Sequence, residues 1–167
     1  MRSRILRAAA AIALSVIAFA GGGQAAPAQS HGSYDLTPDS NKKFLADNAA
    51  RKGVVVLPSG LQYRVIKSGT GISPRGPMDM VTVTYKGWLI DGKVFDQTQP
   101  GQTAQFQAGG LIPGWVEALR RMKEGDEWEL VIPAALGYGA AGAGGAIPPN
   151  QTLVFDMQLS AVAPARP

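Results

Sequence analysis

The sequence predicts a two-layer α+β domain in which one helix packs on the inner face of an antiparallel β-sheet. Apolar and polar residues alternate with a period of two in several short segments, which is typical of strands with one buried and one solvated face. A single apolar stripe with helical spacing interrupts these segments, and glycine and proline clusters separate them. The 167 residues, 46% apolar and 17% charged, suit one globular domain with shorter flanking segments.

Residues 1–28 have the pattern of a secretory signal peptide. Three arginines form a basic start, residues 8–20 are apolar and uncharged, and small residues lead to cleavage after Ala25 or Ala28. A helix as long as the apolar run spans about 20 Å, against roughly 30 Å of membrane hydrocarbon. We therefore expect an exported, periplasmic protein with no stable membrane span after cleavage; an uncleaved leader that anchors the protein is the alternative.

Charge and composition exclude several classes of function. Three of the 16 basic residues lie in the leader, so the remainder has 13 basic and 12 acidic residues and no basic patch that would favour nucleic acid. The chain has no cysteine and a single histidine, His31, in a linker. A thiolate nucleophile and a Cys/His metal site are therefore excluded, and we expect neither a metal nor a cofactor.

Residues 29–56 are expected to form a linker and one short helix. Thr37 and Pro38 resemble an N-cap followed by proline at the first helical position. Apolar residues then recur at helical spacing, and Gly53 stands where a helix stops, so the pattern predicts a helix over 38–52. A partly frayed N-terminal arm is the alternative.

Five strands follow from the alternating pattern, and the hairpin signal Asp91-Gly92 between "WLI" and "KVF" predicts a further short strand that contains "KVF". The last residues, 163–167, are expected to be a loose tail. The predicted strands cover residues 61–67, 80–88, 104–108, 128–133 and 152–162.

One helix is predicted between the strands at residues 104–108 and 128–133. Trp115, Leu119 and Met122 recur at i, i+4 and i+7, which places them on one helical face. The helix would begin at Pro113 and end before Gly125.

A glycine-rich segment, residues 134–151, contains G-x-G-x-x-G from Gly137 to Gly142. The dinucleotide interpretation fails because the motif must open a helix, whereas more glycines and two prolines follow here. Loops of this length are often functional, and Tyr138 among the glycines suggests a flap over a pocket.

Four segments resemble parts of the FKBP-type peptidyl-prolyl cis-trans isomerases: "VTVTYKGWLIDGKVFDQT", "LIPGWVEALRRMKEGDEWELVIP", "LGYGAAG" and "IPPNQTLVFDMQL". They occur in the order and spacing of the family, and the resemblance covers residues 57–162. A further segment, "FLADNAARKGVVVLPSGLQYRVIKSGTG", resembles the bacterial, Mip-like branch. The resemblance implies a strongly twisted antiparallel β-sheet wrapped around one short α-helix, with an aromatic pocket between them.

The resemblance also assigns site residues. Those implied to be catalytic are Tyr85, Phe95, Asp96, Ile112, Trp115, Tyr138 and Phe155, and those implied to contact the substrate further are Phe106, Leu111 and Ile147.

The residues by themselves leave alternatives open. Trp115 and Phe155 could serve only as core residues, and Asp96 could be an exposed charge at a strand end in place of a partner for Tyr85.

The activity that the resemblance implies is rotation about Xaa–Pro bonds in exported proteins, with proline-containing polypeptides as clients and rapamycin-type macrolides as inhibitors. A non-catalytic chaperone or binding module with the same apolar pocket is the alternative function.

Two departures from the family pattern modify these expectations. Ala104, Ala143 and Ala146 stand where bulkier residues are common, so the pocket is expected to be shallower. The Mip-like branch often carries a long dimerisation domain, but only residues 29–56 separate the leader from the main domain. We therefore expect that domain to be missing and the protein to be a monomer.

Overall fold

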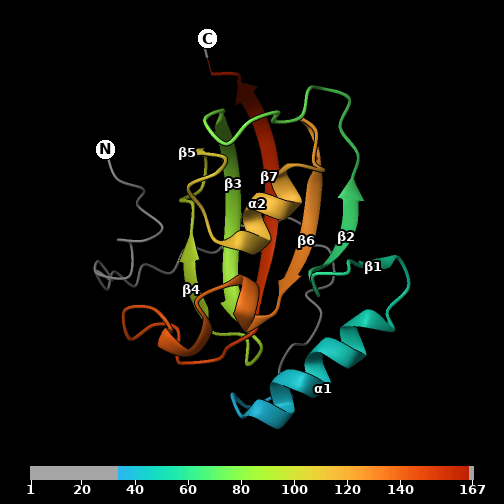
Figure 1. The fold of residues 1–167 in the computed structure, drawn as a ribbon, viewed down its shortest axis with the longest axis vertical. Coiled ribbons are helices and arrows are strands. Elements are labelled where there is room, and N and C mark those ends of the chain that lie inside the picture. Colours follow the sequence, from blue (N-terminus) through green and yellow to red (C-terminus); the bar gives the residue numbers. More distant parts are fainter. Residues whose placement is uncertain (1–33, 166–167) are drawn as a thin grey trace, which may run out of the picture.

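The computed structural model describes residues 34–165 (Figure 1). The predicted leader, His31 and the last two residues lie outside the described residues. Among residues 34–165, no helix has the length and apolarity needed to cross a membrane.

The main element is a seven-stranded sheet in which every pairing is antiparallel. Its spatial order is β1-β2-β6-β7-β3-β4, and β5 also pairs with β3, so β4 and β5 share one edge of that strand. The predicted fold class and the predicted strands are therefore confirmed. The strands are β1 (Val54–Val56), β2 (Gln62–Lys67), β3 (Met80–Leu89), β4 (Val94–Gln97), β5 (Ala104–Gln107), β6 (Glu127–Ile132) and β7 (Leu153–Ala163).

Helix α2 (Pro113–Leu119) packs on the inner face of this sheet, in front of β3, β7 and β6 in Figure 1. Trp115, Leu119 and Met122 are fully buried in the main core, as the helical spacing predicts. The helix is shorter than predicted, and the chain after it forms a turn in which the Asp126 carboxylate accepts hydrogen bonds from the backbone N–H groups of Lys123, at 2.9 Å, and Gly69, at 2.6 Å.

Helix α1 (Pro38–Ala49) begins as predicted, with the Thr37 side chain accepting a hydrogen bond from the Ser40 N–H at 3.3 Å. It ends three residues earlier than the predicted end at residue 52, and the short strand β1 that follows was not predicted. A three-residue strand is too short to produce a recognisable alternation.

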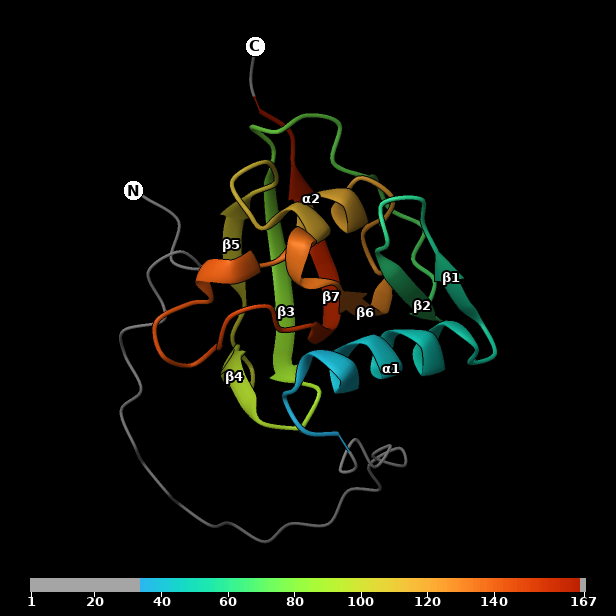
Figure 2. The same ribbon diagram turned by 60° about the horizontal axis from the view of Figure 1, so that its bottom comes forward.

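The face of the sheet opposite α2 is not fully solvated, which corrects the expectation of one wet face. A second core lies there, in which Phe44 of α1 packs with Val131 and Val154. These valines alternate along β6 and β7 with residues of the main core, so they point to the other face. Figure 2 shows α1 separated from α2 by the sheet.

Hydrogen bonds between backbone groups of the 134–151 segment give it a defined conformation. It contains two 3-10 turns, Ala134–Leu136 and Gly139–Ala141, and an isolated bridge in which Ala143 and Ile147 exchange hydrogen bonds of 2.9 and 3.0 Å. No α-helix opens from the glycine motif, so the exclusion of a dinucleotide fingerprint is consistent with the fold.

The described part of the C-terminal tail is attached to the domain, contrary to the expectation of a loose tail. Strand β7 continues to Ala163, and the Ala165 N–H donates a hydrogen bond of 2.8 Å to the buried Asp79 carboxylate. The same carboxylate also accepts from the N–H groups of Arg75 and Gly76. Asp79 therefore ties the tail to the loop before β3.

Candidate functional site

Five rings converge between α2 and the sheet. We call Tyr85, Phe95, Phe106, Trp115 and Phe155 the aromatic cluster. The Trp115 ring lies at its centre, with centroid distances of 5.0 Å to Tyr85, 5.2 Å to Phe155 and 6.1 Å to Phe106. Phe95 meets Phe155 at 5.5 Å. These four pairs are nearly perpendicular, the edge-to-face arrangement that aromatic rings favour.

A register shift in the β3–β4 pair explains how consecutive residues both reach this site. Gly87 pairs with Asp96, but the next residue, Trp88, pairs with Val94, so Phe95 is an extra residue on β4. In an unshifted strand, neighbouring side chains point to opposite faces. A bulge redirects one of them, and here Phe95 and Asp96 both lie toward Phe155 and Tyr85.

Asp96 is bound to Tyr85, as the resemblance implies. The Tyr85 hydroxyl donates a hydrogen bond of 2.7 Å to the Asp96 carboxylate, and both residues are half-buried. Burial raises the pKa of Tyr85, and the hydrogen bond to Asp96 raises it further. Tyr85 therefore remains a neutral donor that holds the carboxylate in place. The alternative that Asp96 is merely an exposed strand-end charge is wrong.

Ile112 and Leu111 lie at the start of α2. Ile112 is buried, and its carbonyl accepts hydrogen bonds from the N–H groups of Trp115 and Val116, which closes the first helical turn. In the described part of the chain, no backbone carbonyl accepts from the Ile112 N–H. Leu111 is half-buried against the main core. The arrangement leaves a backbone donor at the helix start, beside the cluster.

Tyr138 and Ile147 come from the 134–151 segment. Both pack against the main core; Ile147 is buried, whereas Tyr138 is half-buried. Burial, with the charge of Asp96 as a smaller cause, raises the pKa of Tyr138 to about 12. Its hydroxyl is therefore protonated at neutral pH, and within residues 34–165 it has no side-chain hydrogen-bond partner.

All ten predicted site residues thus lie in one region. Nine belong to the main core or pack against it, and Asp96 joins through Tyr85. Trp115 and Phe155 are 1% and 4% exposed, so both are core residues, and contact with a substrate stays a prediction for them. The half-buried members are Tyr85, Phe95, Asp96, Leu111 and Tyr138.

Two residues that the sequence did not point out shape the cluster. A Cβ at Gly87 would lie 2.6 Å from a Phe155 ring atom and 2.8 Å from a Phe95 ring atom, so only glycine leaves room for both rings. Thr98 follows β4 and holds the backbone of Tyr85: its hydroxyl accepts a hydrogen bond from the Tyr85 N–H at 3.2 Å and donates one to the Tyr85 carbonyl at 3.3 Å. Neither glycine in "YKGW" nor threonine in "DQT" carries a local signal for these roles.

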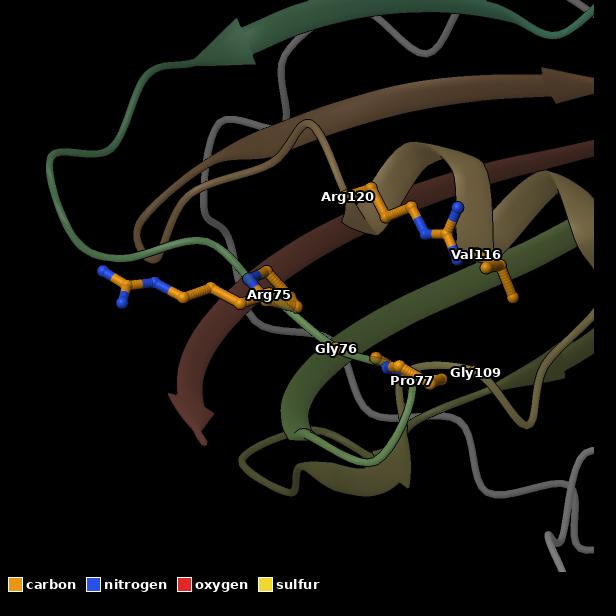
Figure 3. Close-up of a pocket in the computed structure, with 8 residues that line it drawn as sticks. Arg75, Gly76, Pro77, Gly109, Val116 and Arg120 are labelled. Carbon is orange, nitrogen blue, oxygen red and sulfur yellow. The ribbon is translucent and has the colours of Figure 1, made fainter. Parts of the chain in front are cut away.

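A separate pocket lies where α2 meets the loops at residues 74–77 and 108–109 (Figure 3). Pro77, Gly109, Val116 and Arg120 contribute to its lining, and the Arg75 side chain points away from α2 in the view shown. None of its lining residues is aromatic, so this pocket does not match the predicted site.

The chemistry that the cluster offers is non-covalent. Residues 34–165 contain no group of three or more His, Asp or Glu side chains that could hold a metal ion. What the region presents is apolar ring surface, the neutral phenols of Tyr85 and Tyr138, the Asp96 carboxylate and a backbone N–H.

Comparisons with known proteins agree with this arrangement. The sequence model for FKBP-type peptidyl-prolyl cis-trans isomerases matches residues 73–160. The model for the domain amino terminal to such isomerases matches residues 15–65, so part of that domain's sequence is present although the shortness of the segment led us to expect none.

Named relatives are similar over about 120 residues. The chain is 52% identical to the outer membrane protein MIP of Legionella longbeachae over 120 residues, which are 71% of this chain and 51% of that protein. It is 51% identical to the FKBP-type 22 kDa peptidyl-prolyl cis-trans isomerase of Escherichia coli over 118 residues, 70% of this chain and 57% of that one. The chain spans about half the length of these relatives.

Solved structures extend the comparison to the fold. FkpA from Escherichia coli superimposes with a TM-score of 0.72 at 46% identity, over 77% of this chain and 60% of that one. A peptidyl-prolyl cis-trans isomerase from Pseudomonas syringae superimposes with a TM-score of 0.70 at 38% identity, over 84% of this chain and 99% of that one. With the fold, the motifs and the clustered residues in agreement, the chain belongs to the FKBP-type peptidyl-prolyl cis-trans isomerase family.

Proposed function

We propose that this protein is a peptidyl-prolyl cis-trans isomerase that accelerates rotation about Xaa–Pro bonds in exported polypeptides. The convergence of the aromatic cluster with the Tyr85–Asp96 hydrogen bond carries this proposal. The family membership and the names of the relatives support it.

The substrate proline would sit against the half-buried edge of the cluster. Trp115 is only 1% exposed, so it forms the floor beneath the more accessible Tyr85 and Phe95. Phe155, Phe106, Leu111 and Ile147 complete the apolar walls. The Tyr138 hydroxyl and the Ile112 N–H are the donors that can bind substrate carbonyl groups.

The rate acceleration would come from binding the twisted amide better than the planar one. Resonance gives the planar amide a barrier of about 18–20 kcal/mol and a partial negative charge on oxygen, which water stabilises. Apolar rings stabilise that charge separation less, and Asp96 holds Tyr85 beside the rotating bond. A thousandfold acceleration requires only about 4 kcal/mol, which these surroundings and one or two hydrogen bonds can supply.

A protease-coupled assay on Xaa–Pro peptides tests the assignment. Phe95→Ala and Asp96→Ala should each lower kcat/KM by about tenfold or more, which corresponds to roughly 1.4 kcal/mol of lost transition-state stabilisation. Val94→Ala is the matched control, because Val94 is the neighbouring residue on β4 and is 40% exposed. Unchanged rates for both site variants would refute the assignment.

Macrolides of the rapamycin type should bind the same residues and inhibit the reaction. The expectation follows from the family's apolar site, and binding should weaken in Phe95→Ala together with activity. Isothermal titration at micromolar macrolide measures it. Absence of binding to the unmodified protein would mean that Ala104, Ala143 and Ala146 have reshaped the site.

Export is proposed from the leader pattern of residues 1–28, and one relative is itself named an outer membrane protein. Protein recovered from the periplasm should begin after Ala25 or Ala28, and N-terminal sequencing would reveal it; a start at Met1 would contradict cleavage.

The alternative function, holding exported chains without catalysis, predicts suppression of aggregation with no isomerisation in the peptide assay.

A further inference from the structure

Two buried amide side chains join helix α1 to the end of the 134–151 segment. Asn41 of α1 donates to the Gln151 carbonyl oxygen at 3.1 Å, and its own oxygen accepts from the Thr152 N–H at 2.7 Å. Gln151 in turn donates to the backbone carbonyls of Leu36, at 3.1 Å, and Pro149, at 3.0 Å. Both amides are 6% exposed, so each lost bond would leave a buried polar group unpaired.

The connection continues from this junction to Tyr138. The Asn150 N–H donates a hydrogen bond of 2.8 Å to the Gly139 carbonyl, directly after Tyr138. Asn150 has φ of 58°, the only positive φ among the non-glycine residues described. A left-handed backbone at a side-chain-bearing residue persists only where its surroundings hold it in place. Gln151, held by Asn41 of α1 and by the Leu36 carbonyl just before that helix, supplies that restraint.

We propose that Asn41 and Gln151 are positioning residues for Tyr138, so that α1, on the far side of the sheet, fixes the outer wall of the site. The inference rests on the proposed isomerase function, in which Tyr138 is a donor to the substrate. Neither amide reaches the aromatic cluster itself; both act through the backbone of residues 139–150. Helix α1 then contributes to the site by positioning Tyr138, in addition to packing in the second core.

Asn48 provides a matched control on the same helix. It is 4% exposed, donates to the Gln62 side chain at 2.7 Å and accepts from Arg51 at 2.7 Å. It therefore joins α1 to β2 by the same kind of buried amide, but within residues 34–165 none of its side-chain hydrogen bonds leads to the 134–151 segment. Loss of either asparagine should destabilise the fold, whereas only loss of Asn41 should disturb Tyr138.

The kinetic test compares Gln151→Met, Asn41→Ala and Asn48→Ala at a temperature at which circular dichroism shows all three to be folded. Gln151→Met and Asn41→Ala should lower kcat/KM about five- to tenfold, mainly through KM, while Asn48→Ala stays within about twofold. In a Tyr138→Phe background, Gln151→Met should add less than about twofold, because its effect passes through the lost hydroxyl. Additive losses, or an equal loss in Asn48→Ala, would overturn the proposal. Should Gln151→Met not fold, the comparison of Asn41→Ala with Asn48→Ala, alone and in the Tyr138→Phe background, carries the test.

A second measurement does not depend on activity. With ring-labelled tyrosine, the NMR signal of Tyr138 should shift in Gln151→Met and Asn41→Ala and stay unchanged in Asn48→Ala. If the wild-type protein is inactive but the two variants show these shifts, the isomerase function is refuted and the positioning role stands. If the wild-type protein is active but the two variants show no shift, only the positioning role is refuted.

Discussion

At the scale of single residues, the site depends on glycines, which let other side chains and elements approach closely. Gly114 lets α2 approach β6, because a Cβ there would lie 2.6 Å from Ile132. This close approach places Trp115 deep under the sheet, where its indole N–H has no hydrogen-bond partner within residues 34–165. An unpaired buried N–H is unfavourable, so the ring contacts of Trp115 must offset that cost.

Gly87→Ala should disrupt the site more than the fold around it. The new Cβ would lie 2.6 Å from Phe155 and 2.8 Å from Phe95, so the rings must move apart. Overpacking of this kind costs about 1–3 kcal/mol of unfolding free energy, and kcat/KM for Xaa–Pro peptides should fall with the displaced rings. Denaturant unfolding and the peptide assay measure both. Gly76→Ala is the control, because a Cβ there would meet nothing closer than 3.9 Å; equal effects at the two positions would contradict the steric argument.

At the scale of elements, the outer face of the sheet combines a small core with paired charges. The buried Glu129 on β6 forms ion pairs with Arg51, at 2.7 Å, and Arg64, at 3.3 Å. Asp156 lies directly opposite Glu129 on β7. Two carboxylates that face each other across a strand pair repel one another, so the arginines make this pairing tolerable.

Phe44→Ala should weaken the attachment of α1 to the sheet. Phe44 is 4% exposed and packs in the second core, and removing a buried phenyl ring costs about 3–5 kcal/mol of unfolding free energy. Thermal or denaturant unfolding checks the loss. Lys42→Ala, at an exposed position of the same helix, should change stability by less than about 0.5 kcal/mol. A Phe44 variant as stable as the Lys42 variant would mean that α1 is not docked in solution.

Asp156 should make stability depend on pH. Partial burial and the nearby carboxylates Glu129 and Glu127 raise the pKa of Asp156 to about 6. The folded state therefore keeps this proton to a higher pH than the unfolded state, whose pKa is near 3.9. The favourable contribution is complete below about pH 4 and is lost as the pH rises through about 6.

Asp156→Asn should accordingly melt at a higher temperature than the wild type at pH 7.5 and at the same temperature at pH 4. The gain should be small, because much of the side chain is exposed and water screens its charge. Melting curves across this pH range give the comparison. A difference in Tm that does not change with pH would rule out titration of Asp156 as the cause.

At the scale of the whole molecule, the protein without its leader is predicted to be a monomer. The prediction follows from α1, whose Phe44 packs on the sheet of its own chain and so does not present that face to a second copy, and sedimentation equilibrium on the exported protein measures it directly. A mass twice that of the chain would contradict it. The edge strand β1 would then be the first surface to test, because Val55 and Val56 are 42% and 49% exposed there.

Local patterns in the sequence determined most of the sheet and the choice of site residues. Alternation along a strand and helical spacing depend on neighbours in the chain, so the long strands, the Asp91-Gly92 hairpin and the buried face of α2 could be read directly. The family motifs supplied the aromatic residues and the Tyr85–Asp96 pair, whose hydrogen bond the structure contains.

Contacts between distant parts of the chain decided the rest. The bulge that turns Phe95 and Asp96 to one side arises from pairing with β3, and the Asp126 carboxylate joins the turn after α2 to the distant Gly69. The junction of Asn41 with Gln151 joins residues 110 positions apart, and no window of local sequence contains both. Such features are free-energy balances between separate elements, and they exist only once the elements have packed together.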